Sequence, residues 1–167
     1  MTKSNNYLFL TLLLIVLSFT SCSNDDNTSN YRNSYTTADL QIIHNNDSKD
    51  WILEGYYDQY NSKTLNKDNT CYTDEQFSFT ANDGQITVIS GEENCFANAT
   101  QTELTNVSYT FYEETGSVFI TIAKNAELGE VTKSVFFSLQ LVELEENLMI
   151  FASGEENNYG KALVFKR

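Results

Sequence analysis

The stretch QFSFTANDGQITVI, residues 76–89, decides the fold class. Its apolar residues alternate with polar ones on both sides of a turn sequence: Phe77 and Phe79 precede Asn82-Asp83-Gly84, and Ile86 and Val88 follow it. A period of two predicts strands with one buried face, and Asp-Gly accepts the positive φ angles that a tight hairpin requires. The stretch therefore predicts an antiparallel hairpin.

The same alternation extends outward from this hairpin along most of the chain. We expect further strands near residues 51–57, 107–111, 118–122, 135–141, 148–152 and 161–166, with turns at 114–116 and 145–147 and a loop at 154–160. One or two helical turns are expected at 37–44, with Thr37 as the N-cap. Eight strands joined by hairpins predict an all-β domain, an antiparallel eight-stranded meander closed into a barrel or folded as a sandwich. Closure into a barrel removes exposed sheet edges.

The first 21 residues have the features of a removable signal peptide. Lys3 precedes an apolar run from Tyr7 to Phe19, which is short for a permanent membrane span but suits a signal sequence. Thr20-Ser21-Cys22 then resembles the bacterial lipobox, in which the cysteine is acylated and the chain is cleaved before it, although Phe19 replaces the usual leucine. We expect Cys22 to be the lipidated, palmitate-carrying first residue of the mature chain; the alternative is an ordinary signal peptide with an incidental cysteine.

Residues 22–36 are expected to form a disordered tether before a domain at 37–167, because they are rich in Asn and Ser and lack apolar periodicity. The acidic start of the tether, residues 23–26 (SNDD), resembles the export signal that surface lipoproteins of the Bacteroidetes carry after the cysteine. This resemblance implies an outer-membrane protein, lipid-anchored and exposed at the cell surface. A tether that only provides solubility is the alternative.

The charge of the chain excludes one class of partner. The 167 residues suggest one domain and carry a net charge of −13, with no cluster of Lys and Arg. An acidic surface repels phosphate backbones, so we expect no nucleic-acid partner.

The sequence lacks a constellation for catalysis or metal binding. His44 is the only histidine and has no nucleophile near it in sequence, so we expect a surface or packing residue rather than a base. Acidic pairs recur at 92–93, 113–114, 145–146 and 155–156, where adjacent carboxylates at turns point to solvent; a calcium cluster is the alternative, but EF-hand spacing is absent. We therefore expect no enzyme activity, no metal and no cofactor.

Two cysteines remain beside the lipidation candidate. Cys71 and Cys95 form an even pair in an exported chain, which predicts a disulfide between them. A metal site is the competing interpretation, and it lacks further ligands because the sequence has one histidine and no CxxC.

Four groups of residues together resemble the lipocalin-like lipoproteins of the Bacteroidetes, of the flavobacterial type, over roughly residues 40–167. They are Ser48-Lys49-Asp50-Trp51-Ile52-Leu53, Cys71-x-x-Asp74-x-Gln-Phe77-x-Phe79-x-x-Asn-Asp83-Gly84, Gly91-x-x-x-Cys95 and Leu139-x-x-Val-x-Leu144-x-x-Asn-Leu148. The resemblance implies a lipocalin-like eight-stranded meander barrel, usually with no assigned activity. Lipocalins begin with Gly-x-Trp, and here Lys49 replaces the glycine. They also place a cation on that tryptophan from the end of the last strand, which implies Lys166 or Arg167.

Aromatic side chains of one parity are expected to face into such a barrel. The candidate ligand-contacting residues are Tyr57, Phe79, Tyr109, Phe111 and Phe137, with Leu53, Phe77 and Leu139 beside them. Trp51 is expected to plug one end, with a ligand-stacking platform as the alternative. The loop from Asn61 to Thr70 then lies at the open end, where Lys63 and Lys67 are expected to receive the polar or anionic head of an apolar ligand.

Two functions are consistent with these expectations. One is a module whose barrel binds a small apolar or amphipathic molecule at the envelope. The other is a non-catalytic structural or interaction lipoprotein, with a filled barrel and acidic loops that contact another envelope protein. A cavity of several hundred Å³ inside the barrel separates the first from the second.

Overall fold

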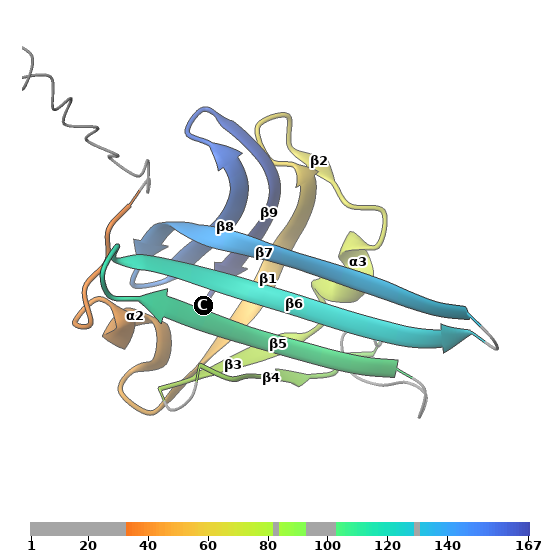
Figure 1. Cartoon of the computed structure of the whole chain (residues 1–167), viewed down its shortest axis with the longest axis horizontal. Helices are drawn as coiled ribbons and strands as arrows, with labels where there is room; N and C mark the ends of the chain where they lie inside the picture. Colours follow the sequence, from red (N-terminus) through yellow and green to blue (C-terminus); the bar gives the residue numbers. More distant parts are fainter. Residues whose placement is uncertain (1–32, 82–83, 93–102, 129–130) are drawn as a thin grey trace, which may run out of the picture. The chain divides into compact units, whose positions relative to one another are not determined.

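Antiparallel strands dominate the computed structural model, which describes residues 33–81, 84–92, 103–128 and 131–167 (Figure 1). Residues 31–167 form one compact unit. Its elements are α2 (Leu40–His44), β1 (Ser48–Gln59), β2 (Thr64–Leu65), α3 (Asn69–Tyr72), β3 (Gln76–Thr80), β4 (Ile86–Ile89), β5 (Glu103–Tyr112), β6 (Ser117–Leu128), β7 (Val131–Glu145), β8 (Leu148–Glu155) and β9 (Asn158–Lys166). The expected all-β class is confirmed.

The strands follow one another around a nearly closed barrel. Their order in the sheet is β4-β3-β1-β9-β8-β7-β6-β5, and the short β2 pairs with β1 beside this path. Because β9 pairs with β1, chain order and spatial order agree around the barrel, which makes it an up-and-down meander of eight strands. The remaining seam lies between β4 and β5, where an isolated bridge joins Gln85 to Ser108. The amide of Tyr109 also donates to the carbonyl of Gly84 across this seam, at 2.7 Å.

The hairpin that decided the fold class forms as predicted. β3 and β4 are antiparallel, with Phe77 opposite Val88 and Phe79 opposite Ile86. Gly84 has a φ of +66°, as the turn sequence required, while residues 82–83 lie outside the described part.

One hydrophobic core receives side chains from every strand of the barrel. Its largest fully buried members are Ile43, Trp51, Leu53, Phe77, Phe79, Ile120, Leu139, Leu141, Met149, Phe151, Leu163 and Phe165. The ring of Phe165 makes edge-to-face contacts with Phe77, Phe79 and Phe151, at centroid distances of 5.1–6.0 Å. Four phenylalanine rings therefore pack against one another in the interior.

A second, smaller cluster lies on the other face of β8 and β9. Ala162 and Val164 belong to it, whereas Leu163 and Phe165, which alternate with them, belong to the main core. On β1 the register against β9 shifts between Leu53 and Gly55, which is a β-bulge. A bulge inserts one residue and reverses the parity of the residues beyond it.

Because of this bulge, one aromatic side chain faces the opposite way from the one expected. Tyr57 was expected to face inward, but it packs in the outer cluster against Tyr60, and Tyr56 enters the main core in its place. The period-two pattern across β1 is therefore broken after Leu53, where the bulge occurs.

Three boundaries differ from the sequence expectations. The N-cap of α2 is Asp39 rather than Thr37, because residues 36–39 form a separate turn in which the Asp39 carboxylate accepts from the Thr36 amide and hydroxyl. The expected loop at 154–160 is mostly strand, since Asn157 adopts a φ of +64° and allows a tight β8–β9 turn.

The third boundary is the start of the folded unit, which begins earlier than residue 37. The Tyr35 amide donates to the carbonyl of Gly116, and Asn33 donates to the carbonyl of Val142. Burial raises the pKa of the Tyr35 phenol to about 12. The end of the expected tether is therefore packed on the domain.

Candidate functional site

Trp51 seals the end of the barrel where α2 lies. The side chain is fully buried, and its indole Nε1 donates to the carbonyl of Ile43 in α2 at 2.9 Å. The last carbonyls of a short helix have no partner within the helix, so this bond joins α2 to the barrel. Trp51 thus acts as a plug, as expected, and its ring is not available as a stacking platform in this structure.

The cation above this tryptophan comes from the same strand. Lys49 Nζ lies 4.5 Å from the centroid of the Trp51 ring and donates to the carbonyls of Ile42 and Glu146 at 2.9 and 3.0 Å. The lipocalin resemblance implied Lys166 or Arg167 in this role, and that expectation is wrong for Lys166, which instead forms an ion pair with Glu54 at 2.6 Å. Lys49, two residues before Trp51, already fills the space over the ring.

His44 is a packing residue, one of the two outcomes expected for it. The residue is 8% exposed, and Nδ1 accepts a hydrogen bond from the amide of Asn46 at 3.1 Å. Burial holds the pKa of His44 below its ordinary value, so the neutral imidazole is favoured in the folded chain.

A polar cluster occupies the inner face of the barrel beside α3. Lys161 has the same parity as the inward Leu163, and its Nζ donates to Tyr56 Oη at 2.8 Å and to Asp58 Oδ1 at 3.1 Å. The ammonium also lies 5.4 Å from the ring centroid of Phe137. Although burial lowers the pKa of Lys161, the hydrogen bonds with Tyr56 and Asp58 outweigh it and raise the pKa overall. Sequence reasoning missed this cation because it did not establish which face Lys161 takes.

Helix α3 packs against the same cluster. The ring of Tyr72 meets that of Tyr56 edge to face, with centroids 5.0 Å apart, and the Asn69 side chain accepts from the Tyr56 amide. The loop expected to be an open mouth therefore leads into a helical turn that packs beside the barrel core.

The candidate ligand-contacting residues do not share one environment. Phe79 and Tyr109 are buried in the main core, and Phe111 and Phe137 pack against it half-buried. Two of the others lie elsewhere: Tyr57 is in the outer cluster, and Lys63 Nζ lies over the ring of Tyr60, 3.4 Å from its centroid. Lys67 is exposed. The described structure therefore does not bring the two expected lysines to the inward aromatic rings.

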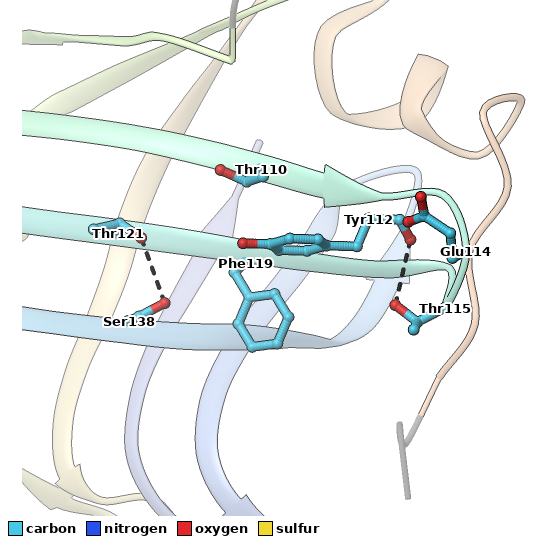
Figure 2. A pocket seen from close by; sticks show the side chains of 7 residues that line it. All are labelled: Thr110, Tyr112, Glu114, Thr115, Phe119, Thr121 and Ser138. Atoms are coloured by element: carbon cyan, nitrogen blue, oxygen red, sulfur yellow. Dashed lines mark hydrogen bonds between the residues drawn. The ribbon is translucent and has the colours of Figure 1, made fainter. Parts of the chain in front are cut away.

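Described residues line several hollows, and in four of them the lining includes no member of the main core. These four measure about 290–440 Å³. One of about 380 Å³ lies on the outward face of β5, β6 and β7, near the turn at 113–116 (Figure 2). Its lining consists of Thr110, Tyr112, Glu114, Thr115, Phe119, Thr121 and Ser138.

Several predicted residues cannot be placed. Cys22 and Cys95 lie outside the described residues, so lipidation and the disulfide remain predictions. Cys71 lies half-buried in α3. No group of three or more His, Cys, Asp or Glu side chains suited to a metal occurs among the described residues. Within the same residues, no helix is long and apolar enough to cross a membrane.

Comparisons with known proteins add no relative. No family model, curated protein or solved structure matches this chain.

Proposed function

We propose that this chain is a non-catalytic, lipid-anchored protein of the outer membrane whose barrel is a closed scaffold and whose recognition surface lies on the outside of that barrel. Of the two functions considered from the sequence, this is the interaction protein with a filled barrel. The anchor is Cys22, and the acidic residues after it favour display at the cell surface.

One observation carries the proposal. Rings and aliphatic side chains from every strand of the barrel pack together in the described interior, whereas four hollows lined by described residues lie away from it. Trp51 and α2 cover one end, and Tyr72 of α3 packs beside Tyr56 near the other. The contacts among these rings argue against an apolar cavity of several hundred Å³ between the described core side chains.

A second candidate function rests on Lys161. This ammonium projects from the inner face of β9 beside Tyr56 and Phe137, an arrangement that suits the head of an amphipathic anion whose tail lies on the rings. Asp58 already pairs with Lys161, so the anion would have to displace a carboxylate that lies 3.1 Å away. Because displacing Asp58 costs free energy, we prefer the filled scaffold to the amphipathic ligand.

A fluorescent fatty acid distinguishes the two candidates. Residues 31–167 are titrated with 11-(dansylamino)undecanoic acid, and the dansyl emission is followed. We expect no saturable rise for the wild type. A saturable one-to-one rise that disappears in Lys161→Met but persists in Lys63→Met would overturn the scaffold proposal in favour of the amphipathic ligand, because Lys63 lies outside the barrel with Tyr60.

A further inference from the structure

The outward face of β5, β6 and β7 carries aromatic side chains that the core does not use. Tyr112 is 50% exposed, Phe136 is 70% exposed, and Phe119 is half-buried. Exposed aromatic side chains that gather on one face of a soluble domain commonly mark a binding surface. The ring of Phe119 meets that of Tyr112 edge to face at 5.7 Å, so the two rings stand nearly perpendicular to each other.

Strand parity fixes this face on the outside of the barrel. Ile120 and Ile122 of β6 belong to the core, so Phe119 and Thr121 project outward. Leu139 of β7 is likewise inward, which turns Ser138 to the same outer side, directly opposite Thr121.

Hydroxyl groups surround the rings of Phe119 and Tyr112. Thr110 is directly opposite Phe119, and Thr121 donates to Ser138 Oγ at 3.4 Å (Figure 2). Thr115, in the turn, donates to the carbonyl of Tyr112, and Glu114 adds a carboxylate. Each hydroxyl oxygen accepts as well as donates, and the carboxylate accepts.

We infer that this hollow binds a neutral saccharide, an inference that rests on the proposed recognition at the outer face and names its ligand class. A pyranose ring presents C–H groups on its face and hydroxyls on its edge. The C–H face fits against the ring of Phe119, with Tyr112 beside it, because aromatic rings carry a negative face that attracts polarised C–H groups. The sugar hydroxyls fit the ring of Thr, Ser and Glu side chains, which offers both donors and acceptors.

The lining excludes the main competing ligand classes. None of the seven lining residues is Lys or Arg, while Glu114 is acidic and the chain has a net charge of −13, so anionic ligands are repelled. Five of the seven side chains are hydroxylated or acidic in addition to Phe119 and Tyr112, so an alkyl chain bound here would remove water from these polar groups without replacing its hydrogen bonds.

Phe136 provides a place for a more distant unit of an oligosaccharide. It precedes Ser138 by two residues on the same face of β7, about 7 Å along the strand, and does not line the hollow. Phe136 is opposite Ala123, four residues or about 14 Å along the strands from Phe119, so a linear oligosaccharide seated at Phe119 meets Phe136 only with a unit beyond its nearest neighbour. The site is therefore expected to prefer an oligosaccharide to its monosaccharide.

Saturation-transfer difference NMR tests the inference on residues 31–167. The monosaccharide probes are the methyl glycosides of glucose, mannose and galactose, and the longer probes are the corresponding unbranched tetrasaccharides. We expect saturable transfer from at least one sugar series. Phe119→Ala should weaken that binding about tenfold or more for both lengths, whereas Phe136→Ala should weaken only the tetrasaccharide. Ile52→Ala, which removes an exposed apolar side chain from β1, is the matched control and should change neither.

Two results would overturn the inference: absence of saturable transfer from all six probes, or binding that Phe119→Ala leaves unchanged. Either result leaves the scaffold proposal intact as long as the fatty acid does not enter the barrel. Conversely, a saturable fatty-acid response overturns the scaffold proposal, while the saccharide titrations of Phe119→Ala and Phe136→Ala still decide whether sugar binds at Phe119.

Discussion

Two lysines near the barrel ends show that burial decides how much a lysine contributes to the stability of the fold. Lys49 is buried over Trp51 and donates to two backbone carbonyls, whereas Lys166 pairs with Glu54 where both side chains are about half exposed. Exposed ion pairs contribute little because water screens them, while a buried donor leaves unpaired carbonyls when it is removed. The sequence indicated that a cation accompanies the tryptophan, but only the structure shows which lysine it is.

The first prediction compares these two lysines. Lys49→Met is expected to lower the free energy of unfolding by about 2 kcal/mol, since the carbonyls of Ile42 and Glu146 lose their donor. Lys166→Met is expected to change it by less than about 1 kcal/mol. Urea denaturation of both variants measures the difference, and equal losses would refute the assigned role of Lys49.

The second prediction concerns pH and His44. Because burial lowers the pKa of His44 in the folded chain, the unfolded chain binds this proton more readily. The stability that the neutral imidazole contributes is therefore fully present above the unfolded pKa of about 6.5 and is lost as the pH falls through the lower folded pKa. We expect the urea midpoint of the wild type to fall below about pH 6.5 more steeply than that of His44→Asn. Parallel curves for the two proteins would contradict the prediction.

At the scale of elements, the sequence predicted which segments form strands, but it predicted only partly which side chains point into the barrel. The alternation around Phe77 and Phe79 placed both in the core, because β3 is regular. On β1 and β7 the register shifts near Glu54 and Val142, and each shift reverses the parity beyond it. Tyr57 was therefore misplaced, since a bulge depends on contacts with a neighbouring strand that a local pattern does not contain. Lys161 was overlooked for a similar reason, because the β8–β9 register also shifts beside it, between Ala152 and Gly154.

The third prediction concerns the seam between β4 and β5. A Cβ at Gly84 would lie 2.2 Å from the carbonyl oxygen of Tyr109, and the φ of +66° disfavours other residues. We expect Gly84→Ala to cost about 2 kcal/mol or more and to increase hydrogen exchange at the Tyr109 amide, which crosses the seam. Gly160→Ala is the control, because its nearest neighbour is the movable Ser153 hydroxyl at 3.1 Å. If both variants are equally stable, the seam contact is not what closes the barrel.

The fourth prediction concerns the two cysteines of the domain. A Cβ on Gly91 would lie 2.2 Å from Asp74, so the chain that leaves β4 passes close to the end of α3 that carries Cys71. Cys95 follows Gly91 by four residues, which supports the predicted disulfide. Cys71→Ser and Cys95→Ser are each expected to lower the free energy of unfolding by about 3 kcal/mol under oxidising conditions, and the double variant by no more. Additive losses, or two free thiols by mass spectrometry, would contradict the pairing.

For the whole molecule, the sequence predicted the meander, which the structure confirms, and an export signal, which stays a prediction. Side-chain volumes and rotamers decide whether inward rings leave a cavity, and the alternation of apolar and polar residues contains neither.

The fifth prediction concerns the proposed lipid anchor. Mass spectrometry of the membrane fraction should find acylated Cys22, and the Cys22→Ala protein should be absent from that fraction. A wild-type chain without acylation would contradict it.

Acrylamide quenching of Trp51 fluorescence tests the closed and filled barrel most directly. Trp51 is the only tryptophan in the sequence and is fully buried at the plugged end, so its emission reports on the interior alone. We predict weak quenching, typical of a buried indole, that does not change when a saturating fatty acid is added. Quenching close to that of free tryptophan, or an emission shift that saturates with the fatty acid, would contradict the closed scaffold.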